Sequence, residues 1–391
     1  MFGFGRLASY DYFVHLEREL VRELGARGQN AATWVVDVPP TASIRRRASR
    51  LAELVASTST SHEGPIHLVG HSTGGVDVRL VASPDASLGC DDAALTWLPR
   101  LASVTTLSTP HYGTPLAAFF ATVSGQRMLY ALSAFTFIGL TLGSPPLAAT
   151  SALVVAIARI DHALGLDIHL LDQATERLLR VLDDAGSPEV RSYLDAIGSD
   201  QGAIVQVMPE AMDLFQATVR DRPGVHYQCT VSMARLPSAM TWVRQLTSPW
   251  GALSTTLFAA LREITSRIDA RYPCAPLQTD DRTQSALVSA FGPAPGVGAN
   301  DGVVPMRSQL HGHVVWAGYA DHLDLLGHFD GRTPRASRRG GRRSSGTQTS
   351  SAKGAPDTPH VDWLRSGAGF DQAHFTAMTR GIVNGMTSSS S

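Results

Sequence analysis

The chain has 391 residues, of which 43% are hydrophobic and 17% charged, so a globular protein with a large core is expected. The formal net charge of −1 does not favour nucleic acid or an anionic surface as the main partner. The three cysteines have no CxxC spacing and do not indicate a zinc or redox site. A single disulfide between Cys229 and Cys274 and free buried thiols are both compatible with the sequence.

The first third of the chain alternates between helical and strand patterns. Apolar side chains recur at helical spacing over residues 11–27, 43–58 and 75–83, and short buried strands are predicted at 32–40, 65–70 and 101–110. Strands that alternate with helices predict an α/β fold with a parallel sheet. No secretory signal is visible in MFGFGRLASYDYF, so the chain as given would be cytoplasmic, and it would be secreted if an upstream segment carried a signal. The localisation is therefore unknown.

The middle of the chain contains a long stretch, residues 128–158, without a charged side chain. Length alone would allow a membrane span, but Gly143–Pro146 divides the stretch into two pieces that are each short for one. We expect a helical hairpin that covers an apolar cleft, and a buried pair of core helices is the alternative.

The second half returns to alternating elements. Helices are predicted at 167–194, 240–268 and near the C-terminus, and strands at 224–233 and 311–319. Residues 331–360 are polar, rich in arginine and low in complexity, so we expect a disordered insertion because the segment cannot bury enough apolar surface to fold.

One motif points to chemistry. Gly70-His71-Ser72-Thr73-Gly74 fits G-x-S-x-G between a predicted strand and a predicted helix. Such a turn strains the serine backbone and lifts its hydroxyl above the sheet, and close approach of strand and helix accounts for a glycine at both ends. The N–H of Thr73 at the helix N-terminus would stabilise a negative charge. The alternative is a glycine-rich turn that holds an idle serine.

A serine nucleophile needs a histidine base and an acid that orients it. In α/β-hydrolases the chain order is serine, acid, histidine, which selects Asp301 in ANDGVVPMRSQ and His322 in YADHLDLLGHF. His111 precedes every suitable acid, and Asp321 is too close in sequence to reach the ring of its neighbour. The other competing histidines are His311, His313, His328 and His374.

Five stretches resemble the bacterial triacylglycerol lipases of the α/β-hydrolase fold: LVGHSTGG, VTTLSTPHYGTP, MPEAMDLFQATVRDRPGVHYQC, NDGVVPMRSQ and DHLDLLGHF. The resemblance implies a mostly parallel central sheet with helices on both faces and a helical lid insertion. It divides the chain into an N-terminal half of the core (1–115), a lid or cap (116–222), a C-terminal half of the core with some cap helix (223–330), the disordered insertion (331–360), and a C-terminal helix and tail (361–391).

The resemblance also implies a second oxyanion donor at Met1, beside Thr73, and the family strand that precedes this position is missing from the sequence. A structural calcium ion would be held by Asp324, two places after His322, and by an aspartate near Asp281. Calcium prefers oxygen ligands, and the glutamine that the family has four places after Asp324 is His328 here, which weakens this interpretation. The alternative for Asp324 is a carboxylate at a helix start. No cofactor is expected for catalysis.

Together these features predict a serine carboxylic-ester hydrolase, most simply a lipase that forms an acyl-enzyme. Its substrate would be an acyl ester or lipid, with transient contact between the lid and a lipid interface. The alternatives are a polyester depolymerase or acyltransferase with the same triad, and a non-catalytic scaffold that binds a hydrophobic ligand. The oligomeric state is unknown.

Overall fold

A computed structural model of the chain describes residues 6–7, 10–39, 41–129, 132, 200–245, 249–293, 295–329, 362 and 364–388. The predictions for Met1, for residues 133–199 of the lid, for the helix at 167–194 and for the insertion at 331–360 lie outside these residues. Only Met128, Leu129 and Leu132 of the uncharged stretch are described, and all three are buried. No helix in the described ranges is both long enough and apolar enough to cross a membrane.

The core is a four-stranded parallel sheet with the order β3 (Ile66–His71), β4 (Leu101–Leu107), β5 (His226–Met233) and β6 (His313–Tyr319). Because all four strands run in the same direction, their carboxyl ends meet at one edge of the sheet. Ser72 follows β3 directly, and His322 follows β6. A separate two-stranded antiparallel pair is formed by β1 (Arg6–Leu7) and β2 (Tyr10–Asp11).

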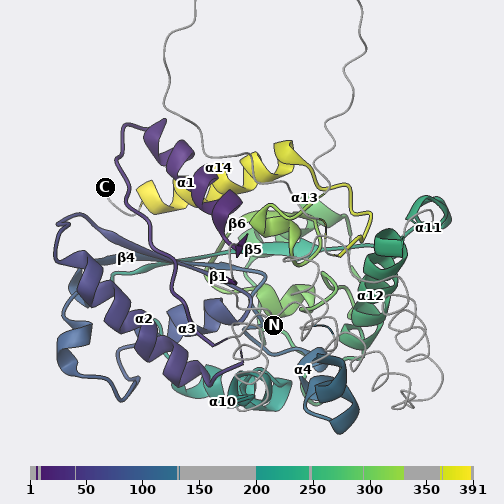
Figure 1. The fold of residues 1–391 in the computed structure, drawn as a ribbon, viewed down its shortest axis with the longest axis horizontal. Coiled ribbons are helices and arrows are strands. Elements are labelled where there is room, and N and C mark those ends of the chain that lie inside the picture. Colours follow the sequence, from purple (N-terminus) through teal and green to yellow (C-terminus); the bar gives the residue numbers. More distant parts are fainter. Residues whose placement is uncertain are drawn as a thin grey trace, which may run out of the picture.

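Helices cover both faces of the sheet. Figure 1 shows α1 (Val14–Gly25) and α14 (Gln372–Ser388) along one face, and α2 (Ile44–Ser59) and α3 (Thr73–Ala82) along the other. This arrangement confirms the predicted α/β fold, and it is the layering of an α/β-hydrolase core. The remaining helices are α4 (Pro115–Phe120), α9 (Gly202–Gln206), α10 (Pro209–Thr218), α11 (Ala239–Gln245), α12 (Pro249–Thr265) and α13 (Asp281–Phe291), with 3-10 turns at Asp92–Leu95, Leu98–Arg100, Met306–Gln309 and Asp324–Leu326.

The helix α2 shows why the pattern of residues 43–58 forms this element. The hydroxyl of Ser43 caps its N-terminus by accepting a hydrogen bond from the N–H of Arg46 at 3.4 Å. One face, which carries Ala48 and Leu51, is buried against β3, α3 and the Trp97 side chain. The apolar residues that recur every 3.6 positions in the sequence are therefore the ones on the buried face of α2.

Two predictions made from the sequence are corrected. The described part of the strand predicted at 32–40 does not form one: residues 29–39 have no ladder pairing, and Trp34 is 48% exposed beside His62. An apolar run forms a buried strand only if both of its faces are covered by other elements. This run is half exposed. The disulfide alternative is also wrong, because Cys90, Cys229 and Cys274 are free thiols.

The turn from β3 to α3 is tightly packed, but at only one of the two glycines that the motif suggested. A Cβ atom at Gly70 would lie 2.3 Å from the carbonyl oxygen of Gly74, whereas a Cβ at Gly74 would meet nothing within 4 Å. The second crowded glycine is Gly75, where a Cβ would lie 1.8 Å from Oγ1 of Thr109. The explanation of close approach therefore holds for Gly70 and fails for Gly74.

This difference predicts opposite outcomes for two alanine variants. Gly70→Ala would force the backbone of β3 and α3 apart, and we expect it to lower the free energy of unfolding by about 1–3 kcal/mol. Gly74→Ala adds a methyl group in open space within the first turn of a helix, and we expect a stabilisation of about 0.5–1 kcal/mol. Denaturant unfolding of both variants measures this contrast, and an equal loss at the two positions would contradict the packing.

Candidate active site

Ser72 lies in a strained backbone conformation at the end of β3. Its φ of 54° and ψ of −128° lie in a region that non-glycine residues rarely occupy. Two hydrogen bonds hold this turn: the N–H of Ser72 donates to the carbonyl of Leu107 on β4 at 2.9 Å, and the N–H of Gly75 donates to the Ser72 carbonyl at 3.0 Å. The serine is 4% exposed and begins α3, so its side chain lies at the positive end of a helix dipole.

The candidate acid, Asp301, is fully buried and fully hydrogen-bonded. Its Oδ1 accepts the backbone N–H groups of Val303 at 2.9 Å and Val304 at 2.7 Å. Its Oδ2 accepts hydrogen bonds from the Ser232 hydroxyl at 3.2 Å and from the Gln309 amide at 3.4 Å. These donors hold the carboxylate in one orientation, because each oxygen faces groups of fixed position.

The candidate base, His322, is paired with that carboxylate. Nδ1 of His322 lies 2.9 Å from Oδ2 of Asp301, and the backbone N–H of His322 donates to the Asp301 carbonyl at 3.0 Å. A carboxylate accepts, so Nδ1 carries the proton and Nε2 is the basic nitrogen. Nε2 is buried and has no hydrogen-bond partner among the residues that the structure describes.

The competing histidines are engaged elsewhere. His111 lies between the Arg79 guanidinium, 3.2 Å from its Nδ1, and the Thr106 hydroxyl, 3.0 Å from its Nε2. Nε2 of His311 contacts Asp221 at 3.0 Å, and Nε2 of His328 donates to the backbone carbonyl of Tyr12 at 3.0 Å. Of the histidines considered, the structure places only His322 in hydrogen-bond contact with Asp301.

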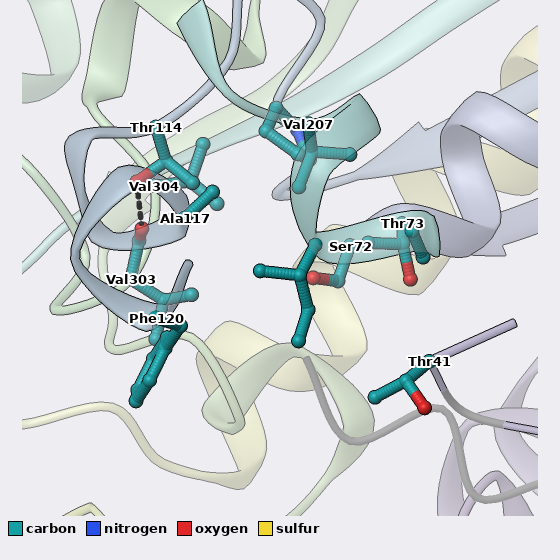
Figure 2. A pocket seen from close by; sticks show the side chains of 12 residues that line it. Thr41, Ser72, Thr73, Thr114, Ala117, Phe120, Val207, Val303 and Val304 are labelled. Atoms are coloured by element: carbon teal, nitrogen blue, oxygen red, sulfur yellow. Dashed lines mark hydrogen bonds between the residues drawn. The ribbon is translucent and has the colours of Figure 1, made fainter. Parts of the chain in front are cut away.

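A mainly apolar pocket opens beside the serine, and its empty space, open solvent included, is about 440 Å³. Figure 2 shows Ser72 and Thr73 on one side of it and Ala117, Phe120 and Val303 on the opposite side. The hydroxyl of Thr114 donates to the carbonyl of Val303 at 2.6 Å and so joins two segments of that wall. The other lining residues are Thr41, Pro110, Ala203, Ile204, Val207 and Val304.

Several parts of the site were not identified from the sequence. The wall residues Val303 and Val304 lie two and three places after Asp301 in NDGVVP, and this proximity was a usable signal. Ser232 and Gln309 have none, because only the fold brings the end of β5 and the residues before β6 to the carboxylate. Thr73 lines the pocket, and its role as an oxyanion donor stays a prediction, whereas Met1 is outside the described residues.

The residues expected to hold calcium are not brought together. Asp281 is in the first turn of α13, next to Asp280, whose carboxyl group is influenced by His313 at the start of β6. Asp324 is buried beyond the end of the same strand, where its nearest charges are Asp321 and Asp362. The described part of the chain contains no group of three or more His, Cys, Asp or Glu side chains placed to bind a metal ion. Asp281 and Asp324 therefore do not form a joint calcium site in the described residues, and calcium at Asp324 stays a prediction.

Asp321 and Asp324 form a buried acidic pair in the turn that carries His322. Oδ2 of Asp324 accepts the N–H of Asp321 at 2.8 Å, and Oδ1 of Asp321 accepts the N–H groups of Leu323 and Asp324 at 3.1 and 3.2 Å. Burial raises the pKa of Asp321 to about 7, and burial together with the Asp321 charge raises the pKa of Asp324 well above its usual range.

Comparison with known proteins supports the lipase resemblance over part of the chain. A triacylglycerol lipase from Vibrio cholerae serotype O1 is 31% identical over 144 residues, which are 37% of this chain and 39% of that protein. The matched segment thus spans about two fifths of the curated relative. No protein-family model matches the chain.

Solved structures of similar proteins include EstA from Clostridium botulinum, which is 19% identical with a TM-score of 0.42 and covers 84% of this chain and 81% of that one. Lipase 1 from Pelosinus fermentans is 17% identical, also with a TM-score of 0.42, and covers 83% of this chain and 90% of that one. Scores of this size do not establish a shared fold, so the fold assignment depends on the sheet order, the helices on both faces and the strained serine turn.

The acidic pair predicts a pH dependence of stability. A folded-state pKa above the unfolded value means that the native protein keeps protons which the unfolded chain loses, so stability falls as pH rises from about 4 to about 7. Asp324→Asn keeps an acceptor for the Asp321 N–H but removes one carboxyl group and its repulsion. We expect the free energy of unfolding, measured in the presence of EDTA, to fall less between pH 5 and pH 8 in the variant than in the natural chain. The difference should be about 1.4 kcal/mol for each unit of raised pKa that the substitution removes.

The comparison of Asp324→Asn with the natural chain isolates the effect of the Asp324 carboxyl group on stability. Burial lowers the pKa values of His71 and His111, so these residues favour the native state as pH rises, but they do so equally in both proteins. Asp280→Asn is the control, because hydrogen bonds from Thr283 lower the pKa of Asp280 and its titration ends below pH 5. Equal pH slopes for Asp324→Asn and the natural chain would contradict the buried pair.

Proposed function

We propose that this protein is a serine carboxylic-ester hydrolase, most simply a lipase or esterase. The observation that carries the proposal is the pairing of His322 with the buried Asp301, which leaves a basic Nε2 at the edge of the sheet where the strained Ser72 also lies. A scaffold that only binds a ligand has no need of a strained serine, a proton acceptor and an orienting acid together. The named relative from Vibrio cholerae adds support over its matched segment.

The reaction follows from the roles of these atoms. Nε2 of His322 takes the proton of the Ser72 hydroxyl as its oxygen attacks the ester carbonyl, and it then gives the proton to the leaving alcohol. The Asp301 carboxylate holds the imidazole through Nδ1 and stabilises the imidazolium that forms. Water then attacks the acyl-enzyme, with His322 acting again as the base.

The oxyanion that forms on the substrate needs hydrogen-bond donors. The N–H of Thr73 is the first donor that the turn offers, since Thr73 follows the nucleophile and begins α3. Met1 stays the predicted position of the second donor. Removal of a single oxyanion donor typically lowers the rate about a hundredfold or more, so the second donor has a large effect on turnover.

The pocket supports an acyl substrate with an apolar chain. Its wall opposite Ser72 is built from Ala117, Phe120 and Val303, which offer no charge to bind a polar acid. Triacylglycerols and simpler esters share this acyl part. Contact of the lid with a lipid surface stays a prediction, because most of the lid lies outside the described residues.

The nucleophile is tested first. Ser72→Ala removes only a hydroxyl group from a buried position, so we expect a folded protein with no ester hydrolysis above background. A fluorophosphonate should label Ser72 of the natural chain, as located by mass spectrometry, and His322→Ala should abolish the labelling because the hydroxyl loses its base. Turnover of p-nitrophenyl butanoate by folded Ser72→Ala would refute the proposal.

The assignment of the pocket predicts a change in specificity. Ala117→Leu adds three carbon atoms to the wall opposite Ser72 and shortens the space for an acyl chain. We expect kcat/KM for p-nitrophenyl dodecanoate to fall about tenfold or more relative to the butanoate. Ala121→Leu, one turn further along and outside the pocket lining, is the matched control and should preserve the ratio of the two esters. If Ala117→Leu left the ratio of the two esters unchanged, the acyl chain would not bind in this pocket.

A further inference from the structure

His71, the residue directly before the nucleophile, makes contacts that the motif does not explain. Its ring is buried, and Nε2 lies 2.8 Å from the backbone carbonyl oxygen of His322. Nδ1 lies 3.3 Å from the hydroxyl of Tyr12. The rings of His71 and His322 are 4.6 Å apart between centroids. The residue thus connects β3, which carries Ser72, to the segment after β6, which carries the base.

The partners of His71 determine its tautomer. A carbonyl oxygen only accepts, so Nε2 of His71 carries the proton and donates it to His322. In the neutral ring Nδ1 is then an acceptor, and the Tyr12 hydroxyl donates to it. Burial, followed by the neighbouring His322, lowers the pKa of His71 well below its usual value, in agreement with a neutral ring.

Three of the four polar groups of His322 are thereby fixed. Asp301 holds the backbone N–H and Nδ1, and His71 holds the backbone carbonyl. The fourth group is Nε2, which has no partner in the part of the chain described. The two Asp301 contacts fix His322 relative to the acid. Of these three contacts, only the one with His71 fixes His322 relative to β3, the strand that leads to Ser72.

We infer that His71 is a positioning residue, which sets the distance between Nε2 of His322 and the Ser72 hydroxyl by holding the His322 carbonyl against the end of β3. This inference rests on the proposed function. His71 touches neither the substrate nor the transferred proton, and it acts through the backbone of His322. Its neutral form matters too, because a charged ring at this separation would oppose the imidazolium that His322 becomes during the reaction.

The experiment compares two amides in place of the imidazole. The amide nitrogen of His71→Gln lies near the place of Nε2 and can still donate to the His322 carbonyl. The amide of His71→Asn is one carbon shorter and ends near the place of Nδ1. His71→Ala removes both contacts. We expect kcat for p-nitrophenyl butanoate to fall about 10- to 100-fold in Asn and Ala, since a misplacement of about 1 Å costs about that much, and to stay within about fivefold in Gln.

Two further readouts separate positioning from a general loss of stability. KM should change little in all three variants, because His71 does not line the pocket. The rate of fluorophosphonate labelling at Ser72 should fall in parallel with kcat, since both depend on the same base. Thermal unfolding gives the folded fraction, to which kcat is normalised. If His71→Ala does not fold, the comparison of His71→Gln with His71→Asn is sufficient to test the inference.

The outcomes are distinct. Loss of kcat in Asn with rescue in Gln supports the inference. Equal kcat in Gln, Asn and the natural chain overturns it, as does a loss that appears only in KM or disappears after normalisation to the folded fraction. If the natural chain neither hydrolyses esters nor labels at Ser72, the proposed function itself fails, and this result is read before any variant is compared.

Discussion

The buried hydrogen bond between Asp301 and His322 is the interaction on which the rest of the site depends. A carboxylate without solvent is costly unless its oxygens are satisfied, and Asp301 meets this requirement with three side-chain donors and two backbone N–H groups. The backbone donors come from Val303 and Val304, which also line the pocket. Acid, base and one wall of the pocket are therefore a single hydrogen-bonded unit, and a movement of one would displace the others.

Ser72, the proposed nucleophile, belongs to a second unit, formed by β3, β4 and α3. The strained turn at Ser72 persists because the Leu107 carbonyl accepts its N–H and because Gly70 allows β3 to lie against the backbone of α3. The His71 ring on the His322 carbonyl is one of the contacts that join this unit to the first, and the hydrogen bond between the Ser108 and Ser232 hydroxyls at 2.8 Å is another. The His71 contact ends on a backbone atom, so it fixes the position of the chain itself.

The parts of this arrangement that were predictable from the sequence are those with local signals. Ser72 was predicted because a strand, a turn and a helix follow one another in the chain, and His322 because it closely follows a strand. The contacts of His71 and Gln309 carried no such signal, since they depend on which segments the parallel sheet brings together. Gly74 shows the limit of the motif: the glycine pattern was correct, but the crowding lies at Gly70 and Gly75. Likewise, the prediction of Asp281 as a calcium ligand needed a residue-by-residue alignment that a distant resemblance does not supply.

Several unfavourable features of the described chain lie at this site. Ser72 has a strained backbone, Nε2 of His322 is buried without a partner, and the pKa values of Asp321 and Asp324 are raised beside it. In a structure selected for stability alone, each would be removed by a common substitution. An active site would account for the features at Ser72 and His322, because a preorganised nucleophile and base have to be held in conformations that they would not adopt by themselves. The well-packed strands and helices beneath them offset that cost.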